Sequence, residues 1–158
     1  MLVHGYNINF SPSSGVSKYT LFIVFYHWRN RSFSLTKKNS SNDNILLKLN
    51  YDKTNNKVNL TVNKTTQSFT MPGSYNGRKI VIWLAENFSS NVTKVKISNY
   101  SSTITISAVL YTNEQEFEFT TEDGVLSKIL FSPNFYDTDS EQFHKVMLQE
   151  KINGSYIV

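Results

Sequence analysis

The chain has 158 residues, of which 39% are hydrophobic, 14% aromatic and 18% charged, and its formal net charge is +4. This length suits one domain with one core, and the composition is too apolar for a chain that stays disordered overall. The absence of cysteine excludes disulfide frameworks, thiol nucleophiles and thiolate zinc sites. No apolar run approaches the length of a membrane span, so no membrane insertion is expected.

Charge is unevenly distributed along the chain. Residues 1–85 carry a formal charge of +9, and residues 86–158 carry −5. A basic half can face phosphates or anionic glycans, but these lysines stand singly or in pairs among Asn and Thr. They lack the interleaved aromatic residues typical of single-strand binding. We therefore expect a solvated basic face and no nucleic-acid partner.

Strand patterns cover most of the chain. Residues 19–28 are so rich in β-branched and aromatic side chains that they predict a central strand buried on both faces. The polar stretch 51–56 has turn chemistry and joins two alternating segments into a hairpin. Further strands are predicted at 32–36, 44–50, 57–62, 67–71, 79–85, 92–98, 103–111, 116–120 and 126–131. This close spacing predicts an all-β fold, a sandwich or a barrel, in a single domain spanning 1–158.

One segment near the C-terminus has helical spacing instead. Thr138 and Glu141 form a capping box, and Phe143, Val146 and Met147 then recur at helical intervals. We expect one short C-terminal helix over about residues 139–151, with Phe143 and Met147 packed onto the sandwich.

The order of these elements is specific. An early strand at 19–25 precedes a paired hairpin, a strand at 78–84, a strand with Val95 and Ile97, and a closing strand at 128–131 with an acidic capped helix. This order resembles the concanavalin A-like, laminin G-like jelly roll over nearly the whole chain, and Asp123-Gly124 fits the turn before the closing strand. The frequent Trp-His of that family is replaced here by Arg78-Lys79, and its Asp-Gly hairpin by residues 99–102. The resemblance implies a two-sheet antiparallel jelly-roll sandwich, and a fold does not fix a function.

Motifs for catalysis are absent from the sequence. The three histidines, His4, His27 and His144, form no His-Glu-x-x-His motif, and no Gly-x-Ser-x-Gly or phosphate-binding glycine loop occurs. No nucleophile or phosphate chemistry is therefore indicated.

Paired carboxylates in one segment resemble those of hydrolases built on a related jelly roll. Glu116 and Glu118 share one strand face, but the step to Glu122 is one residue too long for the motif Glu-x-Asp-x-x-Glu. We expect Phe117 and Phe119 to fill the core while the two carboxylates point into solvent. The interpretation is an acidic edge strand rather than a catalytic pair, and the chain is not expected to be an enzyme.

Calcium is the usual metal of the family that the chain resembles, and it is held by oxygen ligands. The loop acids that could contribute are Asp43, Asp52, Glu122, Asp123 and Asp137. The run Asp137-Thr138-Asp139 is explained by the helix cap. No cofactor is expected, and calcium is the alternative left open.

Aromatic side chains are the main candidates for a binding site. The C–H face of a sugar ring packs on a flat ring while nearby amides and hydroxyls bind the sugar hydroxyls. If Ile82 and Leu84 face the core, alternation places Trp83 on the opposite, concave face, where it is exposed. In the first strand either Phe25 with His27 or Tyr26 with Trp28 faces outward. The candidate ligand-binding residues are Trp83, Trp28, His27, Tyr75 and Tyr100.

These features predict a non-catalytic carbohydrate-binding module. The chain looks most like the modules of bacteriophage tail or baseplate proteins that recognise host cell-wall saccharides, because it is rich in Asn, Lys and Tyr and lacks cysteine. That resemblance implies a virion location, otherwise an extracellular one, with saccharides and other virion proteins as partners. The alternatives are a glycan-binding jelly-roll subdomain of a bacterial toxin or adhesin, and a purely structural virion domain.

Overall fold

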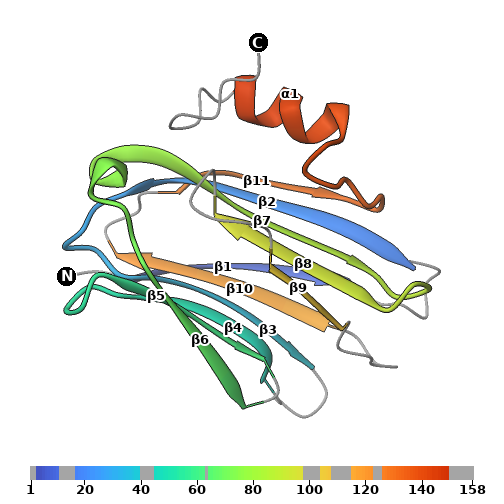
Figure 1. Cartoon of the computed structure of the whole chain (residues 1–158), viewed down its shortest axis with the longest axis horizontal. Helices are drawn as coiled ribbons and strands as arrows, with labels where there is room; N and C mark the ends of the chain where they lie inside the picture. The colour runs from blue at the N-terminus through green and yellow to red at the C-terminus, as the bar shows by residue number, and fades with distance from the viewer. Residues whose placement is uncertain are drawn as a thin grey trace. The chain divides into compact units, whose positions relative to one another are not determined.

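The computed structural model describes residues 3–10, 17–39, 45–62, 64–97, 104–107, 115–122 and 126–149. In these ranges the chain forms two antiparallel sheets and one short helix near the C-terminus (Figure 1). Each sheet is the centre of one compact unit, and each unit takes its strands from separate stretches of the sequence. The predicted all-β class with two antiparallel sheets and one C-terminal helix is confirmed. The single domain over 1–158 stays a prediction.

The first sheet has six strands in the order β1-β10-β3-β4-β5-β6. Their bounds are Val3–Phe10 (β1), Gln115–Glu122 (β10), Phe33–Asn39 (β3), Ile45–Asp52 (β4), Lys57–Val62 (β5) and Thr65–Thr70 (β6). Alternate residues on the four strands from β10 to β5 are buried, as period-two strands with one apolar face require. The buried set is Phe33, Leu35, Lys37, Leu47, Leu49, Tyr51, Val58, Leu60, Phe117, Phe119 and Thr121.

Strand β10 is not an edge strand, so the interpretation of its acids as edge protection is wrong. It lies between β1, which sequence analysis missed, and β3. Phe117 and Phe119 are buried as expected, and Glu116 and Glu118 lie on the opposite face. The register places Glu116 beside Lys38 of β3, a cross-strand neighbour of opposite charge, and Glu118 beside the uncharged Thr36.

The second sheet has five strands in the order β11-β2-β7-β8-β9. Their bounds are Leu126–Ser132 (β11), Lys18–His27 (β2), Arg78–Asn87 (β7), Val92–Ile97 (β8) and Ile104–Ser107 (β9), and a 3-10 turn, η2 (Gly73–Tyr75), precedes β7. Strands β2 and β7 pair along their whole length, and both faces are buried over most of each strand. The predicted central strand with two covered faces is confirmed.

Helix α1 (Glu141–Gln149) covers one face of this second sheet (Figure 1). Phe143 and Met147 are buried against a cluster that contains Phe22 and Trp83, which confirms the predicted contacts of the helix. The cap differs from the prediction, because the Phe143 N–H donates to the Ser140 hydroxyl at 3.1 Å. Ser140, rather than Thr138, caps the helix. Within the described ranges no helix has the length and apolarity needed to cross a membrane.

Candidate functional site

Trp83 is fully buried, and the expectation that its indole is exposed is wrong. Its Nε1–H donates to the carbonyl oxygen of Tyr136 at 2.9 Å, and the Phe143 ring packs edge-on against the indole with a centroid distance of 5.9 Å. Alternation correctly placed Trp83 on the face opposite Ile82 and Leu84. That face is covered by α1 and by the connection that leads to it, so the indole belongs to the core.

The structure decides between the two options left open in the first strand. Phe25 and His27 are buried, whereas Tyr26 and Trp28 are each 44% exposed. Burial lowers the pKa of His27 from 6.5 to about 4, so the imidazole is neutral at neutral pH. It therefore offers a ligand neither an accessible ring nor a charge.

Tyr75 is also buried, and Tyr100 lies outside the described residues. Of the five predicted site residues, Trp28 is thus the one whose described side chain is exposed. His27, Tyr75 and Trp83 belong to the unit of the five-stranded sheet, and Trp28 belongs to the other unit. The described candidates are therefore divided between the two units.

A hollow of about 290 Å³ lies on the six-stranded sheet, in the same unit as Trp28. It is lined by Ser32, Phe33, Ser34, Lys48, Asn50, Tyr51, Thr120, Thr121 and Glu122. Sequence analysis named Glu122 as an acid that could bind calcium, and it chose none of these residues for binding a saccharide. The pattern that predicts an outward polar face is present in the sequence. Strands β3, β4 and β10 each alternate buried apolar residues with polar ones, and these polar residues must share the outward face.

The polar residues next to the hollow form a row across the sheet. Registers between neighbouring strands align Thr120, Ser34, Asn50, Asn59 and Ser68. The Ser34 and Thr120 hydroxyls lie 2.6 Å apart within hydrogen-bond distance, and the Ser68 hydroxyl donates to Asn59 Oδ1 at 2.7 Å. These bonds orient amide and hydroxyl groups before any ligand arrives.

A second polar row runs beside the first. The same registers align Glu118, Thr36, Lys48, Thr61 and Thr66. The Thr61 and Thr66 hydroxyls are 2.8 Å apart. Lys48 is exposed in the middle of this row, and its neighbours across the strands are the uncharged Thr36 and Thr61. Together the two rows give the outward face of five strands a nearly continuous hydrogen-bonding surface.

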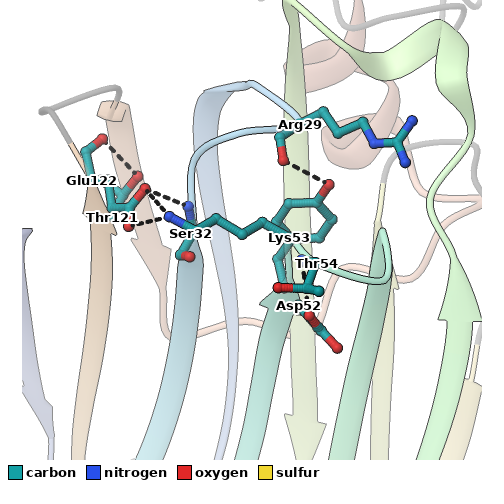
Figure 2. A network of polar contacts seen from close by, with 8 residues as sticks. Arg29, Ser32, Asp52, Lys53, Thr54, Thr121 and Glu122 are labelled. Atoms are coloured by element: carbon teal, nitrogen blue, oxygen red, sulfur yellow. Dashed lines mark hydrogen bonds and ion pairs between the residues drawn. The ribbon is translucent and has the colours of Figure 1, made fainter.

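Glu122 closes one end of the hollow and is held by two donors (Figure 2). Its Oε2 accepts the Ser32 N–H at 3.0 Å, and its Oε1 accepts from Lys53 Nζ at 3.0 Å. Burial acts to raise the pKa of Glu122, but the hydrogen bonds from Ser32 and Lys53 and the charges of Lys53 and Arg31 hold it below its usual value. Glu122 is therefore an anion whose charge is already matched.

The turns that border the hollow are anchored to the core beneath it. The Tyr51 ring stacks on Phe33 with a centroid distance of 5.4 Å. Its hydroxyl lies 3.1 Å from the Arg29 carbonyl oxygen, an acceptor in the turn that follows Trp28 (Figure 2), and 2.8 Å from Asn56 Oδ1. The Tyr51 hydroxyl, which has one hydrogen to donate, thus lies between an acceptor of the 28–32 turn and an acceptor of the 52–56 turn.

The described loop acids are engaged by protein donors and do not gather. Asp52 accepts from the Thr54 N–H at 3.0 Å, and Asp137 accepts from Lys94 Nζ at 2.6 Å. Among the described residues no group of three or more metal-ligating side chains is found. The calcium alternative stays a prediction, and the loop acids Asp43 and Asp123 lie outside the described residues.

Comparisons with known proteins found matches among solved structures but none in sequence. No family model and no curated protein matches the sequence. Among solved structures, galectin-Ib of Xenopus laevis matches at 14% identity with a TM-score of 0.57, over 82% of this chain and 100% of the frog protein. The chain shares the galectin fold. A tetrameric galectin from the ball sponge Cinachyrella sp. matches at 14% identity with a TM-score of 0.57, over 84% of this chain and 100% of the sponge protein.

A third galectin neighbour was solved with a sugar. The toad ovary galectin in complex with thio-digalactose matches at 13% identity with a TM-score of 0.54, over 81% of this chain and 98% of the toad protein. The predicted jelly-roll fold is therefore confirmed, and the resemblance to a carbohydrate-binding fold is supported by the solved structures that share it.

Proposed function

We propose that the chain is a non-catalytic carbohydrate-binding domain that holds its ligand on the outward face of the six-stranded sheet, at the hollow. The observation that carries this proposal is the pair of polar rows across neighbouring strands, with Ser34, Asn50 and Thr120 at the hollow itself. Amide and hydroxyl groups can both donate to and accept from sugar hydroxyls. The galectin fold of the chain supports the same assignment.

The polar groups at the hollow are held in fixed orientations, and this contributes more to the site than apolar contact does. Ser34 is already paired with Thr120, and the anchored Tyr51 keeps the bordering turns in place. A ligand therefore meets groups that lose little freedom on binding, which reduces the entropic cost of association. Trp28 lies four residues before Ser32, in the turn that leads into the hollow, and is the aromatic ring we propose to contact the ligand.

A glycan array tests the proposal, with galactosides among the first probes because the toad galectin binds thio-digalactose. We expect the wild-type chain to bind saccharides and Asn50→Ala to weaken binding about 3- to 10-fold, the loss typical of one hydrogen bond. Gln67→Ala is the matched control, since Gln67 is an exposed amide of the same sheet outside both rows. Absence of saccharide binding, or equal affinity of the Asn50→Ala variant, contradicts the proposal.

The biological setting is a separate part of the proposal. Composition favours an accessory domain of a bacteriophage tail or baseplate protein, located in the virion, with host cell-wall saccharides and virion proteins as partners. The genes beside the coding sequence separate this setting from a bacterial toxin or adhesin. A purely structural virion domain is separated by the array, because a spacer binds no glycan.

A further inference from the structure

The charges around the hollow are not balanced. Glu122 is neutralised by the Lys53 ammonium, which lies 3.0 Å from its carboxylate. Lys48 also lines the hollow and is exposed, and in the described part of the chain its ammonium makes no hydrogen bond or ion pair. Among the residues that line the hollow, the charge left without a partner of opposite sign is therefore that of Lys48.

The residues next to Lys48 do not neutralise its charge. Its neighbours across the strands, Thr36 and Thr61, carry no charge, and Asn50 supplies an amide to the same hollow. The nearest acid in its row is Glu118, which lies beyond Thr36 on β10. An anionic group placed over Lys48 would thus meet one ammonium and several neutral donors.

We infer that the ligand is an acidic saccharide, which carries a carboxylate or a sulfate group opposite Lys48. This inference rests on the proposed function and names its ligand class. A neutral sugar in the same place would offer hydroxyl oxygens to the Lys48 ammonium but no counter-charge, and a charge that is taken out of water without a counter-charge loses solvation free energy. An anionic substituent replaces that lost hydration with a charge-assisted hydrogen bond. The charge of the substituent on the sugar ring then determines which saccharides bind more tightly.

The test uses an array that presents neutral oligosaccharides beside their sulfated and sialylated forms. We expect the acidic forms to bind more tightly than their neutral parents, and Lys48→Gln to reduce their affinity about 10-fold or more. Lys48→Arg keeps the charge and should retain most of the affinity. Lys64→Gln is the control for net charge, because Lys64 is exposed in the turn between β5 and β6 and does not line the hollow. The sulfated and sialylated arms show which anionic group is preferred.

A variant with the opposite expected effect on affinity completes the test. Glu122→Gln removes the anion that Lys53 neutralises, so the hollow gains positive charge and acidic saccharides should bind several-fold more tightly. Preference for neutral saccharides, or an unchanged profile for Lys48→Gln, overturns the acidic-ligand inference and leaves the proposed function standing. Failure to bind saccharides of either class rejects the proposed function itself.

Discussion

The indole N–H of Trp83 and the carbonyl oxygen of Tyr136 form a hydrogen bond of 2.9 Å that fastens the connection between β11 and α1 to the five-stranded sheet. The N–H of the same Tyr136 donates to the Thr20 hydroxyl at 2.7 Å. Thr20 in turn donates to the Asn134 carbonyl oxygen at 2.7 Å. Both polar main-chain groups of Tyr136 are therefore bound by side chains of neighbouring strands, which positions the start of the helix.

Trp83 should accordingly act as a core residue in stability measurements. We expect Trp83→Ala to lower the free energy of unfolding by about 3–5 kcal/mol, the range for large buried aromatic residues. Trp83→Phe keeps most of the packing but leaves the Tyr136 carbonyl without its donor, and should cost about 1–3 kcal/mol. Urea unfolding measures both, with Trp28→Ala as an exposed aromatic control that changes stability by about 0.5 kcal/mol or less. Equal losses for Trp83→Ala and Trp28→Ala would contradict the buried role.

The helix cap gives a second prediction. Ser140→Ala removes the acceptor for the Phe143 N–H, so we expect a loss of about 1 kcal/mol in the free energy of unfolding. Thr138→Ala should cost less, because Thr138 lies before the cap. Thermal unfolding of the two variants distinguishes them, and a larger loss for Thr138→Ala would restore the capping box predicted from the sequence.

His27 predicts a sensitivity to mild acid. Its pKa is 6.5 when it is solvated and about 4 in the fold, so the unfolded chain takes up a proton first as the pH falls. The stability is fully present above pH 6.5 and declines toward pH 4, by up to about 1.4 kcal/mol per pH unit. His27→Gln should remove this slope in denaturant unfolding at a series of pH values. Parallel curves for the two proteins would show that the imidazole does not titrate in this way.

The acids whose pKa is lowered in the fold act in a different pH range. Hydrogen bonds from the Ser32 N–H and Lys53 hold the pKa of Glu122 below its usual value, and a hydrogen bond from Lys94 does the same for Asp137. Their contribution to stability is therefore lost only as the pH falls through the acidic range of carboxyl groups. Both groups are present in the wild type and in His27→Gln. The difference between the two curves therefore isolates His27.

The absence of glycosidase activity is the fourth prediction. Glu116 and Glu118 lie half-buried on the outward face of β10, and they have the polar Lys38 and Thr36 of β3 as cross-strand neighbours rather than apolar surroundings. A general acid for glycoside cleavage needs such surroundings to keep its proton near neutral pH. Incubation with cell-wall polysaccharide should release no reducing ends, and Glu116→Gln should bind as the wild type does. Release that disappears in Glu116→Gln or Glu118→Gln would assign the chain to the glycosidases.

Sequence patterns predicted the strands better than they predicted the site. Period-two alternation placed Phe117 and Phe119 in the core, and helical spacing identified Phe143 and Met147 as the buried face of α1. These features depend on neighbours within one element. Strand β1 was missed although residues 6–10 alternate, because Gly5 and two asparagines lower its strand propensity.

Whether Trp83 is exposed or buried could not be predicted from its own strand. Alternation fixes the side of the sheet to which a residue points, but whether that side is open depends on α1, far away in the sequence. The hollow raises the same difficulty, since Ser34, Asn50 and Thr120 come together only through the strand order β10-β3-β4. Single aromatic residues can be recognised as binding candidates in the sequence, whereas the polar rows are defined only by the registers between strands.

The pairing of Val3 with Glu122 has a consequence for how the chain reaches its native state. Strands β3 to β6 are consecutive hairpins that can form soon after synthesis, but β10 must later insert between β1 and β3. A topology dominated by such distant pairings has a high contact order, and domains of this kind fold on the scale of milliseconds to seconds. Until residue 122 has left the ribosome, the hydrogen-bonding edge of β3 has no partner, and this interval is when the nascent chain is most exposed to aggregation.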